Sequence, residues 1–258
     1  MKVVILAGGL GTRLSEETKL RPKPMVEIGG RPILWHIMKI YSHFGYNEFC
    51  VALGYKGDEV KKFFMNYQAV SSDFSMSLKT GEKQYYNSPR EDWTLHLIDT
   101  GANTLTGGRI FRLKHFLKNE ETFMLTYGDG VSNIDINALV KFHKSHGKVA
   151  TITAVRPPAR FGALQIEGGQ VVDFHEKVQL HEGWINGGFM VFNREIFNYL
   201  DDDSNILEKE PLERLARDRQ LMAFHHESFW QPMDTIRDRD FLNSLWSSGN
   251  APWKIWKE

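Results

Sequence analysis

The chain has 258 residues, of which 41% are hydrophobic and 25% charged, which is enough for one large α/β domain with a sizeable core. Lysine and arginine together number 32, as do aspartate and glutamate, so net charge gives no long-range attraction for nucleic acid or an anionic membrane. The single cysteine, Cys50, excludes an internal disulfide, and the absence of any bilayer-length apolar run excludes a spanning segment, so a cytoplasmic location is expected.

The first 25 residues carry the most informative pattern. The apolar run 3–6 predicts a buried strand, and it is too short for a signal peptide. The loop 8–13 that follows reads Gly-Gly-Leu-Gly-Thr-Arg; glycines let main-chain N–H groups close on an anion, and the threonine and arginine add donors for phosphate. Lys23 stands between Pro22 and Pro24, which stiffen the segment that presents its ammonium. This stretch predicts a polyphosphate site.

Two familiar phosphate motifs do not fit the same stretch. A P-loop needs Gly-Lys-Ser/Thr after its glycines, and that sequence is missing. The dinucleotide fingerprint needs a third glycine where Leu14 stands. The loop therefore points to a nucleotide site of another kind.

The next segments alternate between predicted helices and strands. Apolar residues recur at helical spacing over 34–41, so a helix is expected from about Pro32 to Gly45. Residues 49–53 predict a second buried strand, which would hold Cys50, and residues 58–67 predict another helix. This order is typical of a parallel sheet covered by helices.

Residues 68–95 interrupt this order. They are polar, and they are too many for a plain connection, so they predict an excursion with structure of its own, a hairpin or a subunit contact. A strand resumes at 95–98. A second glycine-rich loop, 104–109, opens a helix whose N-terminal N–H groups would favour an anion or a polar base edge, although a plain turn is the commoner use of such a loop.

The strand predicted at 121–127 ends in Gly128-Asp129-Gly130. Open α/β sheets bind ligands beyond the carboxyl ends of their strands, so Asp129 is a candidate metal ligand rather than a solvated turn residue. A helix over 135–146 is expected next, with Asp135 as its N-cap and Gly147 at its end. His143 and His146 on that helix are expected to be a surface pair rather than a metal site.

The second half of the chain predicts further strands and short helices without a linker or repeat. The expected strands are 149–155, 163–166 with 171–175 as a hairpin, 184–192 and 221–225, and the expected helices are 196–200, 211–217 and 236–246. Thr235 is a suitable N-cap for the last helix. Trp253 and Trp256 are expected to pack on the body or on a neighbouring subunit. We expect a single domain, 1–258, with the excursion at about 68–95 and a helical C-terminal part at about 236–258.

The candidate residues suggest chemistry at phosphorus. Magnesium prefers few carboxylates together with phosphate oxygens and water, so Asp129 and a second acid, Asp234, suffice for a Mg²⁺ site. Displacement at a phosphorus of a nucleoside triphosphate depends mostly on positioning and charge neutralisation. A sugar 1-phosphate attacker has a second pKa of about 6, so it needs no general base near neutrality.

Four motifs together resemble the sugar-1-phosphate nucleotidyltransferases. They are Gly8–Leu14 followed by Pro22–Met25, then Gly128–Gly130, Ile185–Phe189 and Phe229–Thr235. The resemblance covers essentially the whole chain, and within that family the motifs together look like those of the glucose-1-phosphate cytidylyltransferases. It implies an α/β, Rossmann-like, mostly parallel central sheet with helices on both faces, the nucleotide-diphospho-sugar transferase fold. It also implies that CTP and α-D-glucose 1-phosphate give CDP-glucose and pyrophosphate with Mg²⁺, for O-antigen lipopolysaccharide, in a homo-oligomer.

The same resemblance implies roles for individual residues. Arg13 and Lys23 are expected to be catalytic, and Asp129 and Asp234 to hold the metal. The expected substrate-binding residues are Leu6, Ala7, Gly8, Gly9, Leu10, Gly11, Thr12, Arg13, Lys23, Thr104, Arg109, Gly128, Lys177 and Asn186. Of these, the first loop would hold the triphosphate, Thr104, Arg109 and Gly128 the cytidine side, and Lys177 and Asn186 the sugar phosphate. Many relatives have proline where this chain has Val178, so a looser loop is expected after Lys177.

Two alternatives remain open at this stage. The chain could use UTP or dTTP, because base choice depends on hydrogen bonds that motif spacing does not reveal. It could also be a non-catalytic sensor of nucleotide sugars, although both basic residues and both acids stand at their motif positions.

Overall fold

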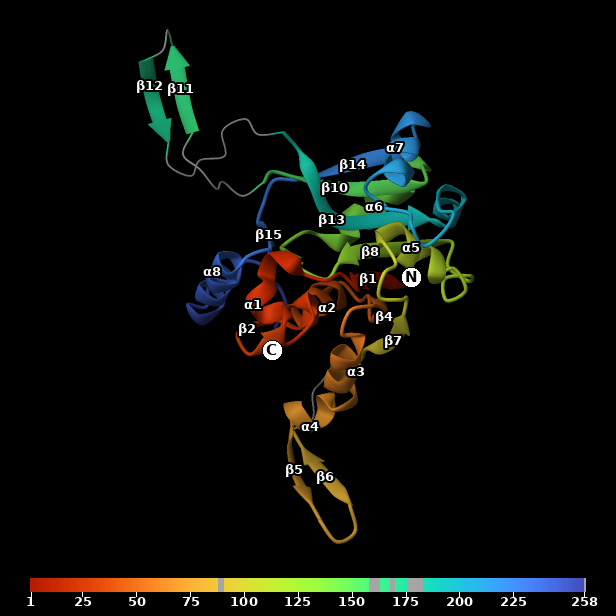
Figure 1. Cartoon of the computed structure of the whole chain (residues 1–258), viewed down its shortest axis with the longest axis vertical. Coiled ribbons are helices and arrows are strands. Elements are labelled where there is room, and N and C mark those ends of the chain that lie inside the picture. Colours follow the sequence, from red (N-terminus) through yellow and green to blue (C-terminus); the bar gives the residue numbers. More distant parts are fainter. Residues whose placement is uncertain (88–90, 158–162, 168–169, 176–182, 258) are drawn as a thin grey trace.

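The computed structural model describes residues 1–87, 91–157, 163–167, 170–175 and 183–257; for Arg13, Ser15, 163–167 and 171–175 it describes the backbone alone. A seven-stranded sheet forms the centre of the molecule (Figure 1). Its strands are β1 (Val3–Ala7), β4 (Glu48–Leu53), β7 (Thr94–Asp99), β8 (Thr122–Tyr127), β10 (Ala150–Val155), β13 (Ile185–Asn193) and β14 (Leu221–His226). Their order is β14-β10-β13-β8-β1-β4-β7, and β13 runs antiparallel to both neighbours while the other pairs are parallel. The predicted mostly parallel sheet is confirmed.

Two hydrophobic cores lie on opposite faces of this sheet. Successive side chains of a strand point to opposite faces, and accordingly Val3 and Ile5 of β1 join one cluster while Val4 and Leu6 join the other. The first cluster is covered by α2 (Ile33–His43), α6 (Ile136–His146) and α8 (Ile236–Ser247). The second is covered by α5 (Thr106–Arg112), α7 (Glu210–Arg217) and the 3-10 helix η3 (Arg194–Tyr199). Helices therefore cover both faces, as predicted.

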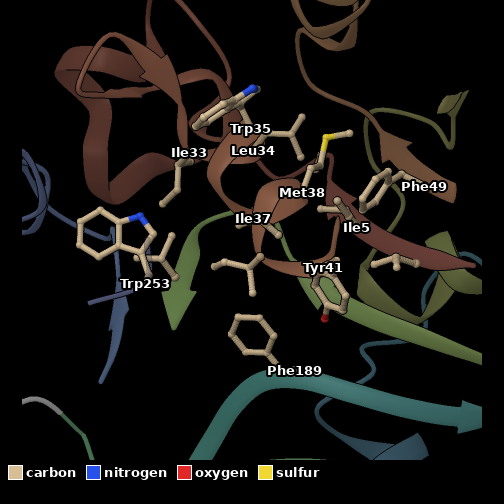
Figure 2. Packing of buried hydrophobic residues seen from close by; sticks show 14 of the residues in the cluster. Ile5, Ile33, Leu34, Trp35, Ile37, Met38, Tyr41, Phe49, Phe189 and Trp253 are labelled. Atoms are coloured by element: carbon tan, nitrogen blue, oxygen red, sulfur yellow. The ribbon is translucent and has the colours of Figure 1, made fainter. Parts of the chain in front are cut away.

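Helix α2 buries the face that the spacing of its apolar residues predicted. Leu34, Ile37, Met38 and Tyr41 are all fully buried. Figure 2 shows these side chains filling the space between α2 and the sheet, with Tyr41 directed toward Phe189 of β13; their rings stack with centroids 6.0 Å apart. Trp253 and Trp256 from the end of the chain are also buried against this cluster, so they pack on the body of the same molecule.

The remaining elements are short and lie outside the central sheet. They are η1 (Thr12–Leu14), α1 (Ser15–Thr18), η2 (Lys23–Met25), α3 (Gly57–Met65) and α4 (Tyr67–Ser71), and the paired strands β2 (Glu27–Ile28) with β3 (Arg31–Pro32), β5 (Asp73–Met76) with β6 (Lys83–Tyr86), β9 (Gly130–Ser132) with β15 (Trp230–Pro232), and β11 (Ala163–Glu167) with β12 (Gln170–His175). The antiparallel pairing of β11 with β12 confirms the hairpin that was predicted from residues 163–166 and 171–175.

The excursion at 68–95 has structure of its own, as predicted. Strands β5 and β6 form an antiparallel hairpin that projects from the body beyond α3 and α4 (Figure 1). The helix predicted over 58–67 is instead two helices, because Asn66 takes a non-helical conformation and its side-chain amide donates to the carbonyl of Lys62 at 2.8 Å.

The burial of two side chains and the end of the last helix test three further predictions. Cys50 is fully buried on β4 as predicted, and burial raises the pKa of its thiol to about 12. The expected surface pair is wrong for His143, which is 1% exposed and hydrogen-bonds Thr151 and Asn193. The C-terminal part is helical only to Ser247, and turns follow. Among the described residues, no helix combines the length and apolar content needed to span a bilayer.

A buried histidine joins α2 to the end of the chain. The ring of His36 contacts the carbonyl of Ile28 at 2.8 Å through Nε2 and accepts from the indole N–H of Trp253 at 3.4 Å through Nδ1. Burial lowers the pKa of His36 to about 4, although the hydrogen bond to Ile28 acts in the opposite direction. The folded protein therefore holds this imidazole neutral at pH values where the unfolded chain protonates it.

This arrangement predicts a pH dependence of stability. Between about pH 6.5 and pH 4 the unfolded state binds a proton at His36 that the folded state excludes, so stability falls as pH falls through this window, by up to about 3 kcal/mol. Urea unfolding of wild type and His36→Gln across pH 4–7 measures the effect. The variant is expected to have the flatter profile, with exposed His115→Gln as control; parallel profiles for wild type and His36→Gln would contradict the prediction.

Candidate active site

A pocket of about 330 Å³ opens at the carboxyl edge of the central sheet. Strands β1 and β8 both end there, and β4 ends beside them. The structure brings most of the predicted site residues together in its wall. The pocket is lined by the predicted residues Leu6, Ala7, Gly8, Gly9, Gly11, Thr12, Lys23, Thr104, Arg109, Gly128 and Asp129, and also by Pro24, Leu105, Thr106 and Tyr127.

The glycine-rich loop forms one wall, with its backbone accessible. Gly11 has φ +64°, and a Cβ there would lie 2.7 Å from the side chain of Thr18, so both conformation and space require glycine. The hydroxyl of Thr18 donates to the carbonyl of Gly11 at 3.1 Å and fixes the turn that leads into η1. A Cβ on Gly9 would meet nothing within 4 Å, so this part of the loop faces open space. The backbone can therefore approach a ligand closely.

Lys23 lines the pocket from η2 and lies next to the glycine-rich loop, since a Cβ on Gly11 would be 3.2 Å from the Cβ of Lys23. Pro22 and Pro24 flank it, and the N–H of Met25 closes the turn on the carbonyl of Pro22 at 2.8 Å. The ammonium donates to Asp129 at 2.6 Å and to Asp234 at 2.7 Å. Burial alone would lower the pKa of Lys23, but the attraction and hydrogen bonds of the two carboxylates outweigh it, so its pKa is raised. The lysine is a fixed cation at the edge of the pocket.

Two short strands bring the two carboxylates together. Asp129 precedes β9, which pairs with β15, and the N–H of Met233 donates to the carbonyl of Asp129 at 2.8 Å. Asp234 follows at once, before a capping box in which Thr235 and Asp238 close the N-terminus of α8. The N–H of Asp234 donates to Asp238 at 3.1 Å. The pairing of β15 with β9 before Asp234 and the capping box of α8 after it thus hold the Asp234 carboxylate beside the ammonium of Lys23.

This pair of carboxylates fits the chemistry of a magnesium site. Both approach one ammonium, so their oxygens converge on the same small region. Within the part of the chain that the structure describes, no three His, Cys, Asp or Glu side chains gather where they could hold a metal by themselves. Magnesium is commonly bound by one or two carboxylates with substrate phosphates and water completing the shell. The donor set therefore suits a metal that is shared with a phosphate ligand.

Arg109 lies under the glycine loop rather than across the pocket opening. It is 4% exposed, and its guanidinium donates to the carbonyls of Gly8 at 2.9 Å, Leu53 at 3.0 Å and Gly101 at 2.8 Å. It also donates to the hydroxyl of Thr100 at 2.7 Å. These contacts tie the ends of β1, β4 and β7 together.

Two amides at the N-terminus of α5, those of Gly107 and Gly108, have a backbone partner. The N–H groups of Gly107 and Gly108 both donate to the carbonyl of Asn205, at 2.9 and 3.2 Å. A Cβ on Gly108 would lie 2.5 Å from the backbone of Asp203, so these glycines allow the loop 203–205 to pack on the helix. A distant loop therefore uses both amides, which agrees with a structural turn, the commoner use of such a glycine-rich loop.

Sequence reasoning missed Tyr127 as a member of the pocket. Its hydroxyl donates to the carboxylate of Glu208 and accepts from the side-chain amide of Asn186 at 3.4 Å. Glu208 also accepts a hydrogen bond from the hydroxyl of Thr106 at 2.6 Å. Gly188 permits this arrangement, since a Cβ there would lie 2.6 Å from the Tyr127 ring. Because Tyr127 directly precedes Gly128-Asp129, the sequence could have indicated that it lies in the pocket. No comparable feature of the sequence indicated that Glu208 contacts it.

The remaining predicted residues lie elsewhere or outside what the structure describes. Asn186 is not in the pocket wall but contacts it through Tyr127. Leu10 is 57% exposed and does not line the pocket. The side chain of Arg13 and the whole of Lys177 fall outside the described residues.

Known proteins are similar to this chain in sequence and in architecture. A family model described as "Nucleotidyl transferase" matches residues 2–238. The glucose-1-phosphate cytidylyltransferase of Salmonella typhi is 52% identical over 257 residues, covering 100% of both chains. The mannose-1-phosphate guanylyltransferase catalytic subunit beta of Dictyostelium discoideum is 30% identical over 95% of this chain and 64% of its own length. The solved structure of HddC from Yersinia pseudotuberculosis complexed with GMP-PN has a TM-score of 0.68 at 24% identity, covering 95% of this chain and 99% of that one, which supports the fold alone.

Proposed function

The chain belongs to the nucleotidyl transferase family, and from that premise we propose that it joins CTP and α-D-glucose 1-phosphate to give CDP-glucose and pyrophosphate. The observation that carries the proposal is the contact of Lys23 with Asp129 and Asp234 beside an accessible glycine loop. Full-length similarity to a glucose-1-phosphate cytidylyltransferase supports the choice of substrates.

In this proposal the glycine loop binds the triphosphate of CTP, and Lys23 neutralises charge at the α-phosphate. A phosphate oxygen of glucose 1-phosphate attacks the α-phosphorus, and the bond from that phosphorus to the bridging oxygen of the β-phosphate breaks as pyrophosphate leaves. The attacking phosphate is already ionised near neutral pH, because its second pKa is about 6. The protein therefore needs to position the groups and to neutralise charge, and no general base is required.

Asp129 and Asp234 are the residues that would hold Mg²⁺. When bound, the ion would offset negative charge on the phosphates that it contacts. Thr104 and Gly128 in the pocket wall are proposed to bind on the cytidine side, and Asn186 on the side of the sugar phosphate together with Lys177. Arg13 is proposed to assist the loop with the triphosphate.

A matrix of nucleotides and sugar phosphates tests the function. Purified protein with Mg²⁺ is assayed for pyrophosphate release with CTP, UTP and dTTP, each with and without glucose 1-phosphate. We expect release that depends on glucose 1-phosphate and is fastest with CTP. Faster turnover of UTP or dTTP would reassign the base, and no release with any nucleotide would favour a sensor over an enzyme.

We also propose that residues 1–258 act as one domain in a cytoplasmic homo-oligomer that supplies a sugar nucleotide for O-antigen lipopolysaccharide. The projecting β5–β6 hairpin exposes Phe74, Met76 and Leu78, which suits a contact between subunits. The single buried thiol of Cys50 suits a reducing compartment. Light scattering of the purified protein measures the mass, and a monomer at micromolar concentration would contradict the assembly.

A further inference from the structure

An ion pair joins the segment after the glycine-rich loop to the last helix. The guanidinium of Arg239 on α8 donates to the carboxylate of Glu17 on α1, across 222 residues of sequence. Helices α1 and α8 lie side by side at this contact (Figure 1). The side chains of Arg239 and Glu17 are 25% and 24% exposed, so water and salt screen this pair less than they screen a fully exposed one.

The residue after Glu17 connects α1 to the glycine-rich loop. The hydroxyl of Thr18 is buried and donates to the carbonyl oxygens of Gly11 and Leu14, at 3.1 Å in each case. The N–H of Leu14 closes the same turn on the carbonyl of Gly11 at 3.0 Å. Because Gly11 lines the pocket, a displacement of α1 would change the shape of the loop that faces a ligand.

Arg239 lies on the element that positions Asp234. The N–H of Arg239 donates to the carbonyl of Thr235 at 3.0 Å, which places Arg239 in the first turn of α8. Asp234 directly precedes the capping box of this helix, and its carboxylate accepts from Lys23 at 2.7 Å. The ion pair therefore links the turn of the glycine-rich loop to the Asp234 carboxylate through two short pieces of regular structure.

Helix α1 is held between α8 and the turn after β4. On the side of β4, the hydroxyl of Tyr55 donates to the carbonyl of Thr18 at 3.3 Å, and the ammonium of Lys56 donates to the carbonyl of Lys19. Loss of the ion pair would free α1 on the side of α8, while these backbone contacts keep it on the body of the protein. A variant without the pair is therefore expected to stay folded.

We propose that Glu17 and Arg239 are positioning residues that hold the glycine-rich loop at a fixed distance from the Asp234 carboxylate. This inference rests on the proposed function, because it concerns how the same pocket binds a polyphosphate. Neither Glu17 nor Arg239 lines the pocket, so the pair acts through Thr18 on one side and the capped end of α8 on the other. A loop that is already in place loses less conformational freedom when a polyphosphate binds, so the pair strengthens binding.

Binding of inorganic tripolyphosphate at a fixed Mg²⁺ concentration tests this role without a base or a reaction. Calorimetry compares wild type with Glu17→Gln, Arg239→Gln and the variant that carries both changes. Each single variant is expected to bind about five- to tenfold more weakly. The double variant should bind no more weakly than either single one, because the two residues act as one pair.

Two further variants complete the binding experiment. The charge-reversed variant, Glu17→Arg with Arg239→Glu, restores an ion pair of opposite polarity and is expected to bind within about twofold of wild type. Glu27→Gln is the matched control, because it removes a second ion pair of the same segment, with Arg21 at 2.6 Å, that joins the segment to β2 rather than to α8. This control should bind tripolyphosphate as wild type does.

Steady-state kinetics separate positioning from a general loss of stability. In Glu17→Gln and Arg239→Gln, KM for CTP should rise by the same factor as the loss of tripolyphosphate affinity, while kcat stays within about twofold of wild type. This pattern is expected because the pair contributes equally to binding in the ground state and in the transition state. KM for glucose 1-phosphate should not change, whereas a loss of folded protein would lower kcat.

Wild-type tripolyphosphate affinity in folded Glu17→Gln and Arg239→Gln would overturn the proposal. Losses that add up in the double variant would also overturn it, because independent effects do not come from a pair. If circular dichroism shows that a single variant is unfolded, the charge-reversed variant decides, and a tenfold weaker affinity in that protein would overturn the proposal. Failure of wild type to form CDP-glucose would reject the proposed function, yet the tripolyphosphate affinities would still report on the ion pair.

Discussion

Lys23→Ala is expected to lower kcat by about a thousandfold while leaving the protein folded. The ammonium is the cation that the structure places against both Asp129 and Asp234 at the edge of the pocket. Charge develops at the α-phosphate as pyrophosphate leaves, and removal of a group that neutralises it raises the barrier rather than weakening ground-state binding alone. Steady-state kinetics with CTP and glucose 1-phosphate measure the loss.

Two controls sharpen this measurement. Lys23→Met keeps the length of the side chain and loses only its charge, so a similar loss in both variants would identify charge as the cause. Lys19→Ala removes an exposed lysine from the neighbouring segment and should leave kcat unchanged. Circular dichroism and thermal unfolding check the fold, and turnover within tenfold of wild type in folded Lys23→Ala would reject the catalytic role.

Asp129→Asn and Asp234→Asn are expected to lower kcat by about 10²- to 10³-fold at a fixed Mg²⁺ concentration. Each replaces a carboxylate by an amide of the same shape, and magnesium binds the neutral amide more weakly. Because both acids serve one ion and one lysine, the double variant should lose less than the product of the two single losses. Magnesium titrations of activity should show a higher half-saturating concentration in each single variant.

Asp135→Asn supplies the comparison for the acid variants. Asp135 is an exposed N-cap of α6, where asparagine caps as well as aspartate, so this variant should keep the wild-type magnesium response. An Asp129→Asn or Asp234→Asn protein with the same half-saturating magnesium concentration as wild type would remove that residue from the metal site.

Local signals predicted the sheet and most of the pocket. The apolar runs at 3–6 and 121–127 became β1 and β8, and the glycines that follow each strand brought Gly8 and Asp129 to one edge. The carboxyl ends of parallel strands lie at the same edge of a sheet, whatever the conformation of the loops between them. The order of the elements along the chain was therefore enough to predict that Gly8 and Asp129 lie at one edge. The signal for His143 was also present: Ile136, Leu139 and Val140 lie at helical spacing before it, and the same face is buried.

Contacts between distant loops could not be predicted in the same way. The β9–β15 pairing joins strands of three residues each, which is too short for a pattern, yet it places Asp234 beside Asp129. The carbonyl of Asn205 occupies the amides of α5, and Glu208 holds Tyr127, although the segment from 201 to 209 has neither helical nor strand periodicity. These contacts depend on close packing against glycines. The sequence shows where the glycines are, but it does not show which distant segment packs on each of them.

The hydrogen bond between Lys23 and Asp234 spans 211 residues of sequence. On a ribosome, which adds about 5–20 residues per second, the glycine loop and Lys23 would emerge many seconds before their C-terminal partner. A nascent chain therefore carries the lysine and the first aspartate without the second. Translation must pass residue 234 before the three charged groups can meet, so a prematurely terminated product that lacks residue 234 would lack a complete centre, however much of its sheet had formed.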